Sequence, residues 1–223
     1  MSESDRERWN RRYAEGRGPR QEPDPFLVAS LPWLHPVRTP ARALDLASGP
    51  GGNALWLAER GWSVEALDIS DVALERLTGE ARRRGLSGRI RARRADLERW
   101  RLPSCGEAAY DLVVLTWYLE RRLLPEMRKA VRPGGFVLVR TFLRGTRRPL
   151  PPAWVLEPGE LLEAYRGWRT LRHAESTALG EAAYLGQRPA GTGATAGRPS
   201  PLPGRTAARP PSSLLDGVDA EPG

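Results

Sequence analysis

The sequence predicts an α/β fold in which a doubly wound, mostly parallel sheet of seven strands carries helices on both faces. Three observations lead to this prediction: strand-like apolar runs alternate with helical segments, a glycine-rich turn follows the first run, and the fourth run is apolar without interruption. An uninterrupted apolar run is typical of a strand that is buried on both faces. Right-handed crossovers between such strands bring their carboxyl ends to one edge of the sheet.

The predicted elements of the first half alternate regularly. Strands are expected at Arg42–Ala47, Ser63–Leu67 and Arg89–Ala95, and helices at Asn53–Arg60 and from Ser70 to about Arg84. Gly61 and Gly85 follow the two helices, as expected for helix ends. Ser70 is a suitable N-cap residue, and Asp71 in the first turn of its helix favours the helix dipole.

The second half continues the alternation with less regular spacing. Strands are expected at Tyr110–Trp117 and Phe136–Phe142, a helix between them on the apolar stripe Leu123, Leu124, Met127 and Val131, a further helix at Pro158–Tyr165, and two last strands near Trp168–His173 and Ala182–Arg188. The sequence RPGG at Arg132–Gly135 is expected to break the first of these helices.

The basic charge of the chain invites a nucleic-acid interpretation. The formal net charge is +8 and the pI is near 10.6, but Lys129 is the only lysine among the 35 basic residues. Such a ratio, together with abundant Ala, Gly, Pro and Leu, indicates a coding bias towards GC-rich codons. Because the basic residues are scattered among 27 acidic ones, a solvated arginine surface is favoured over a nucleic-acid partner, which stays open.

Composition also suggests the compartment and the domain boundaries. The N-terminus lacks a signal-peptide core, no apolar run reaches membrane-span length, and Cys105 is the only cysteine, so a cytoplasmic protein without disulfide or metal is expected. Residues 1–188 are expected to form one domain, with residues 1–40 as an N-terminal helical cap region. Residues 189–223, rich in Pro, Gly and Ala and without aromatic residues, are expected to be a disordered tail.

The glycine-rich turn carries the first functional signal. Gly49, Gly51 and Ala54 fit the form G-x-G-x-x-A, and the carboxylate of Asp68 follows 19 positions after Gly49. Glycines allow close backbone approach, and a downstream acid can accept from the vicinal hydroxyls of a ribose. A nicotinamide dinucleotide, another nucleoside cofactor and a plain glycine turn all fit these residues. Asp45, at the end of the first strand, suits a cationic ligand such as S-adenosylmethionine better than a pyrophosphate.

Polar residues also end the other predicted strands. Gly49, Asp68, Asp96 and Thr116 each fall at a strand's carboxyl end, so the topology brings them to one crevice. In open α/β sheets, ligands bind outside these ends where the strand order reverses.

Several ordered segments resemble one enzyme family. "LDLASGPGGNALWLAERG" is similar to the first motif of the class I S-adenosylmethionine-dependent methyltransferases, and "VEALDIS", "RADLERW" and "YDLVVLTWYLERRLLPEMRKAVRPGGFVLVRTF" resemble their later motifs. "DRERWNRRYAEG" looks like the N-terminal helix that closes over the cofactor in the tellurite-resistance and ubiquinone-type branch. The resemblance covers roughly residues 5 to 187 and implies a Rossmann-like fold. Ala47 and Ser48 depart from it, since the family usually has glycine and often cysteine there.

The resemblance implies a role for each residue near the strand ends. The implied contacts are the backbone of Ala47, Gly49 and Gly51 with the methionine moiety, Asp45 with the loop or the ammonium, Asp68 with the ribose, Ile69, Asp96 and Leu97 with the adenine, Thr116 with the sulfonium end, and Arg12 or Tyr13 with the carboxylate. An exposed helix arginine is the alternative for Arg12.

Methyl transfer needs alignment and exclusion of water more than it needs a catalytic triad, and a base is required only when the acceptor must lose a proton. Glu120 is the candidate base, with a helix-start acid as the alternative. A small-molecule acceptor is expected, with Trp117, Tyr118 and Trp154 as candidate pocket walls and Arg144, Arg147 and Arg148 as candidate anion contacts. An RNA or protein methyltransferase and a non-catalytic S-adenosylmethionine-binding regulator are the alternatives. The sequence does not indicate an oligomeric state.

Overall fold

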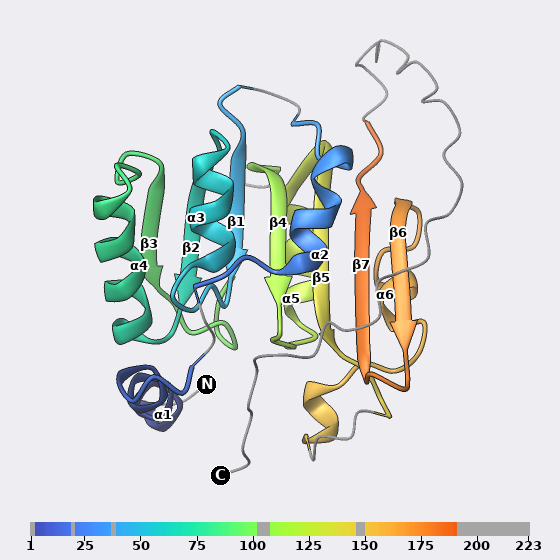
Figure 1. The fold of residues 1–223 in the computed structure, drawn as a ribbon. Helices are drawn as coiled ribbons and strands as arrows, with labels where there is room; N and C mark the ends of the chain where they lie inside the picture. Colours follow the sequence, from blue (N-terminus) through green and yellow to red (C-terminus); the bar gives the residue numbers. More distant parts are fainter. Residues whose placement is uncertain (1–2, 19–20, 37–38, 102–107, 146–149, 191–223) are drawn as a thin grey trace.

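The computed structural model describes residues 3–18, 21–36, 39–101, 108–145 and 150–190, and a seven-stranded sheet forms its centre (Figure 1). The strands are β1 (Arg42–Leu46), β2 (Ser63–Asp68), β3 (Ile90–Arg94), β4 (Tyr110–Thr116), β5 (Val131–Phe142), β6 (Arg169–Ser176) and β7 (Glu181–Gln187). The helices are α1 (Glu3–Ala14), α2 (Pro25–Ser30), α3 (Gly52–Glu59), α4 (Asp71–Arg83), α5 (Leu123–Ala130) and α6 (Glu160–Ala164), with short 3-10 turns η1 (Leu31–Trp33) and η2 (Pro152–Trp154).

The strand order is β3-β2-β1-β4-β5-β7-β6, which confirms the predicted doubly wound sheet. Strands β1 to β5 are parallel, whereas β7 is antiparallel to both β5 and β6. The chain moves outward from β1 through β2 to β3, and then returns to the other side of β1 with β4. The strand order therefore reverses between β1 and β4, which makes their carboxyl ends the expected ligand edge.

The sheet divides the apolar core into two layers, and neighbouring residues of a strand face opposite layers. Ala43 packs in the layer that contains Leu27 of α2, Leu55 of α3 and Leu77 of α4. Leu44 packs in the layer that contains apolar side chains of α5 and α6, including Met127 and Leu161. The helices thus cover both faces of the sheet, as Figure 1 shows.

The beginning of β5 differs from the sequence-based prediction. Helix α5 ends at Ala130, and β5 starts at Val131 rather than at Phe136, so the RPGG segment lies inside the strand. The pairing with β4 shifts register between Tyr110 and Leu112 to accommodate it. A Cβ on Gly135 would lie 2.9 Å from the carbonyl oxygen of Asp111, so glycine lets the two backbones approach.

Several expectations lie outside the described residues. They concern Cys105, Arg147, Arg148 and all but the first two residues of the expected tail at 189–223. Within the described ranges, no helix is long and apolar enough to cross a membrane.

Candidate active site

The glycine loop joins β1 to α3 at the carboxyl edge of the sheet. The Ser48 amide donates to the Leu67 carbonyl at 3.0 Å, which ties the loop to β2. Gly51 has a φ of 89° and is the N-cap of α3. A Cβ on Gly51 would lie 2.1 Å from Cδ1 of Leu77, so this position requires glycine both for its backbone conformation and for the approach of α4.

Asp68 ends β2, and its carboxylate accepts a hydrogen bond from the glycine loop. Its Oδ2 accepts from the Gly49 amide and its Oδ1 accepts from the Ser70 amide, each at 2.8 Å. The carboxylate is 7% exposed, and burial raises its pKa while the bonds from Ser70 and Gly49 lower it. Asp68, which is predicted to bind the ribose, therefore also orders the loop and the start of α4.

Asp45 lies near Asp68 at the carboxyl edge of the sheet and is almost completely buried. Neither of its carboxylate oxygens forms a hydrogen bond of ordinary geometry with a described residue, although the Asn53 side chain and the Ala54 amide lie close enough to lower its pKa. Burial dominates and, with the nearby charge of Asp68, raises the pKa of Asp45 to about 7. A buried, unpartnered carboxylate is costly, which is typical of a residue that meets a ligand.

Two non-glycine residues adopt left-handed conformations where strands end. Ala47 follows β1 with a φ of 52°, and Trp117 follows β4 with a φ of 58°. Alanine pays a steric cost in this region because its Cβ approaches the following carbonyl oxygen. Glycine, which is usual at this position in the family that the sequence resembles, adopts this conformation without that cost.

Replacing Ala47 by glycine is expected to raise the free energy of unfolding by up to about 1 kcal/mol, because relief of the left-handed strain exceeds the added chain entropy of the unfolded state. Urea denaturation measures the change. Ala43→Gly in the extended part of β1 is the matched control and is expected to destabilise the protein. Equal destabilisation by the two variants would contradict the strain.

The N-terminal segment crosses the glycine loop. The Tyr13 hydroxyl lies 2.8 Å from the position that a Cβ on Gly49 would take, and the Tyr13 side chain is buried. Nε2 of Gln21 donates to the Pro50 carbonyl at 2.8 Å. A Cβ on Gly52 would lie 2.1 Å from the carbonyl oxygen of Glu22, so this segment lies directly on the start of α3.

Helix α1 is attached to the start of α4. Oδ1 of Asn10 accepts from the Ser70 hydroxyl at 2.7 Å and from the Val72 amide at 3.3 Å, while Arg6 pairs with Asp71 at 3.5 Å. These contacts hold α1 beneath the carboxyl edge of the sheet, where Figure 1 places it. They also set the face of α1 from which Tyr13 reaches the loop.

An ionic cluster on this edge was not anticipated from the sequence. Arg140 in β5 donates to Oδ1 of Asp24 at 3.2 Å and to Oε2 of Glu181 at 2.8 Å, and Nε1 of Trp117 donates to Oδ2 of Asp24 at 2.9 Å. Asp24 also caps α2 by accepting from the Phe26 amide. The sequence carried two signals: an Asp-Pro pair at a helix start and a lone charge inside the apolar run FVLVRTF.

The remaining predicted cofactor residues lie at or near the same edge. Oγ1 of Thr116 accepts from the Asn53 side chain at 3.1 Å, and Oδ1 of Asp96 accepts from the Glu98 amide at 3.0 Å. Ile69 is buried directly after β2, whereas the Leu97 side chain packs in the core, so its backbone is the part available to a ligand.

Arg12 and Glu120 both have partners within the protein. The Arg12 guanidinium lies 5.5 Å from the Trp9 ring and donates to the Arg17 carbonyl at 3.5 Å, whereas the Tyr13 hydroxyl lies against Gly49 of the loop. Oε1 of Glu120 accepts from the amide and from Nε of Arg122, at 3.2 and 3.1 Å.

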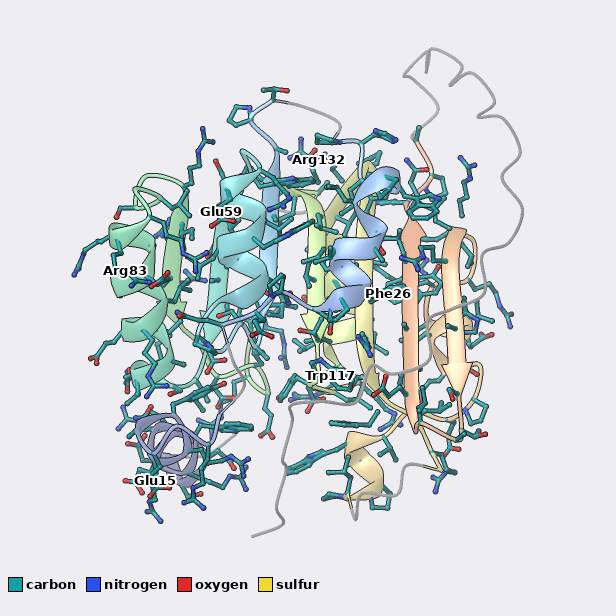
Figure 2. All side chains as sticks on the ribbon, viewed as in Figure 1. Glu15, Phe26, Glu59, Arg83, Trp117 and Arg132 are labelled. Carbon is teal, nitrogen blue, oxygen red and sulfur yellow. The ribbon has the colours of Figure 1, made fainter. Side chains whose placement is uncertain are left out.

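Aromatic side chains surround the carboxyl ends of β4 and β5. The rings of Trp117 and Phe142 lie 5.3 Å apart, and Figure 2 shows Trp117 at this edge of the sheet. Trp154 of η2 is 45% exposed, and the Arg8 guanidinium of α1 lies 6.0 Å from its ring. Arg144, a predicted anion contact, forms a bidentate pair with Glu157, which neutralises its charge. The described part of this edge is therefore more aromatic than cationic.

Comparisons with known proteins find similar methyltransferases. Residues 43–135 match a family model described as a methyltransferase domain. The chain is 32% identical over 152 residues to malonyl-[acyl-carrier protein] O-methyltransferase of Salmonella typhimurium, covering 62% of this chain and 58% of the relative. It is 28% identical over 155 residues to hemagglutinin 1 of Eikenella corrodens, covering 67% and 51%. The chain thus spans little more than half the length of these curated relatives.

Solved structures show the same fold. TehB of Haemophilus influenzae aligns with a TM-score of 0.59 at 22% identity, covering 73% of this chain and 60% of TehB. A geranyl diphosphate methyltransferase in complex with S-adenosylmethionine aligns with a TM-score of 0.59 at 16% identity, covering 72% and 83%. Residues 43–135 thus match a methyltransferase-domain model, and the strand order and these likenesses show the fold of the class I S-adenosylmethionine-dependent methyltransferases.

Proposed function

We propose that the chain binds S-adenosylmethionine in the crevice between β1 and β4 and transfers its methyl group to a small-molecule acceptor. The observation that carries the proposal is Asp45, a buried carboxylate without a hydrogen bond of ordinary geometry, beneath a glycine loop. A ligand with an ammonium and a sulfonium gains from this charge, whereas the pyrophosphate of a nicotinamide dinucleotide is repelled by it.

The residues of the crevice fit such a ligand. The loop from Ala47 to Gly51 offers backbone groups to the methionine moiety, and Asp45 offers a charge to its ammonium. We assign Asp68, at the end of β2, to the ribose hydroxyls and Ile69 to the adenine. Asp96 and the Leu97 backbone are assigned to the adenine edge.

The cofactor supplies an electrophilic methyl group on a sulfonium, so the protein has to align the acceptor and exclude water. Tyr13, Gln21 and Glu22 cover the glycine loop and shield this part of the crevice from solvent. Thr116 at the end of β4 is assigned to the sulfonium end, between the loop and the aromatic edge. Glu120, after the same strand, is the candidate base for acceptors that must lose a proton.

A small acceptor with an apolar or aromatic part agrees best with the described edge. Trp117, Phe142 and Trp154 offer aromatic surface, while Arg144 is already paired with Glu157 and Arg140 with Asp24 and Glu181. The printed names of several relatives, including a geranyl diphosphate methyltransferase, refer to acceptors of low molecular weight.

Calorimetry with S-adenosylmethionine, S-adenosylhomocysteine and NADH in parallel tests the cofactor. We expect saturable binding of both adenosyl compounds and none of NADH, because Asp45 opposes a pyrophosphate. Binding of NADH alone would overturn the proposal.

Acceptor screening separates the alternatives. Turnover on a small molecule supports the proposal, whereas cofactor binding without turnover on any acceptor class would indicate a regulator. Turnover on RNA, with binding that weakens steeply as salt rises, would assign the arginine-rich surface to a nucleic acid.

A further inference from the structure

A basic cavity lies at the edge of the sheet opposite the candidate active site. It has a volume of about 210 Å³ and is lined by Arg128, Lys129, Trp168 and Arg188. The first two residues lie in the last turn of α5, Trp168 precedes β6, and Arg188 follows β7, so three separate parts of the chain meet where β5 begins. Arg132, labelled in Figure 2, marks this edge, whereas Trp117 marks the opposite one.

We propose that this cavity binds a phosphate group, either free or at the end of a small organic molecule. Arg128 and Arg188 form no ion pair with any carboxylate in the described ranges. Lys129 pairs with Glu126 at 3.0 Å, so the lining keeps the equivalent of two uncompensated positive charges. Two such charges around a small cavity favour an anion of high charge.

The Arg188 guanidinium uses only one of its three nitrogens in the hydrogen bonds that the structure describes. Its Nη1 donates to the carbonyls of Arg128 and Val131, which fixes the side chain at the end of α5. Its Nε and Nη2 have no hydrogen-bond acceptor among the residues that the structure describes. These two groups form the fork that binds two oxygens of a phosphate side by side.

The Arg128 side chain is also held in place. Its Nη1 donates to the Ala164 carbonyl at 2.8 Å, and its guanidinium lies 5.9 Å from the Tyr165 ring and 5.4 Å from the Trp168 ring. These contacts use the side chain to cap α6, yet its positive charge stays without a carboxylate partner. A cationic group fixed before binding loses little conformational entropy when an anion arrives.

The size and wall of the cavity limit the ligand. A volume of about 210 Å³ is below the range of about 300–1,000 Å³ that is usual for drug-sized ligands. A phosphate with a short organic remainder fits this size, and the Trp168 indole offers an apolar surface to that remainder. A carboxylate would use one fork but leave the second guanidinium uncompensated.

Calorimetry on the full chain with inorganic phosphate at constant ionic strength tests the proposal. We expect saturable binding with a Kd of about 1 mM or tighter. Arg188→Gln is expected to weaken it about tenfold or more, and Arg188→Lys by an intermediate factor, since lysine keeps the charge and loses the fork. Arg82→Gln, which removes an equal charge from the exposed side of α4, is the matched control and should leave the affinity unchanged.

Lys129→Gln is the second variant, because its exposed side chain makes a single described ion pair and its loss does not threaten folding. It should weaken phosphate binding about threefold. S-adenosylmethionine binding should stay unchanged in Lys129→Gln, which separates this site from the proposed methyl-transfer site. Absence of saturable phosphate binding, or equal losses in Arg82→Gln and Lys129→Gln, would overturn the proposal.

Glycerol 3-phosphate, glycerol and a short RNA distinguish the sources of the phosphate, and none of them carries the free adenosine for which the candidate active site is proposed. Equal affinity for free phosphate and glycerol 3-phosphate supports a free-phosphate site, and tighter binding of glycerol 3-phosphate, with none of glycerol, supports an organic phosphate. Binding of RNA alone, with equal sensitivity to Arg82→Gln, would show a general polyanion surface and overturn the proposal.

Discussion

Replacing Asp45 by asparagine is expected to raise the free energy of unfolding at pH 8 by about 1–3 kcal/mol and to weaken S-adenosylmethionine binding at least about tenfold. The two effects have one cause. The native state buries a carboxylate that lacks a hydrogen bond of ordinary geometry, and a cationic ligand would relieve that burial. Asparagine removes the charge, so it removes both the cost in the free protein and the attraction for the ligand.

The pH dependence of stability gives the sign of the effect. Burial raises the pKa of Asp45 from an ordinary value of 3.8 to about 7. Between these two values the unfolded chain has released the proton while the native state keeps it, so stability falls as the pH rises. Three pKa units correspond to about 4 kcal/mol, and the loss is complete above pH 7.

Thermal or urea unfolding of wild type and Asp45→Asn between pH 4 and pH 8 measures this change. The stability difference between them is expected to grow through that window and to level off near pH 8. Wild-type affinity for S-adenosylmethionine should rise through the upper part of the same window, and the variant should lose this rise. Parallel pH profiles for the two proteins would contradict the buried charge.

Asp111→Asn is the matched control, because Asp111 is also buried but is paired. Its Oδ2 accepts from the Arg42 amide at 2.8 Å, and its Oδ1 lies 3.3 Å from Nε of Arg132. The same substitution should therefore destabilise the protein and leave cofactor affinity unchanged, since Asp111 begins β4 at the edge away from the site.

Replacing Asp68 by alanine is expected to lower the free energy of unfolding by about 2–4 kcal/mol and to weaken cofactor binding by about 1–3 kcal/mol. The first loss arises because the amides of Gly49 and Ser70 lose their acceptor in a buried place. The second arises because the ribose hydroxyls lose a charged acceptor. A further sign is a lower pKa for Asp45, since the charge of Asp68 helps to raise it.

Calorimetry and denaturation on the same protein samples separate these effects. Asp71→Ala is the control: Asp71 is 41% exposed, lies three positions away, and pairs only at a distance of 3.5 Å with Arg6 and Arg94, so its loss should cost less than about 1 kcal/mol. Unchanged cofactor affinity in Asp68→Ala would mean that the ribose assignment is wrong, whatever the change in stability.

Local sequence patterns were sufficient to predict most strands of the sheet and the helices between them. The apolar run Tyr110–Thr116 and the glycine stops at Gly61 and Gly85 are effects of neighbouring residues, so they can be read directly from the chain. The start of β5 could not be predicted in this way. The sequence Arg132–Gly135 is typical of a turn, and it lies in a strand only because β4 pairs with this part of the chain across a register shift.

The orientation of α1 shows the same limit at the candidate site. The sequence offered Arg12 and Tyr13 as equivalent neighbours on a helix. The bonds of Asn10 to the start of α4 select the face of α1 that meets the loop, and this face presents Tyr13. The local helix propensity of α1 does not determine which of its faces meets the loop.

The alternation of elements, the glycine loop and the carboxylates at the strand ends can be predicted from the chain, because each depends on short-range spacing and on the rule that parallel strands end together. How these groups are paired depends on the folded structure. It joined Arg140 to Asp24, 116 positions away, and left Asp45 buried without a hydrogen bond of ordinary geometry to a described residue. Burial and pairing depend on what the rest of the chain places around a residue, and they set the charge that the site can offer to a ligand.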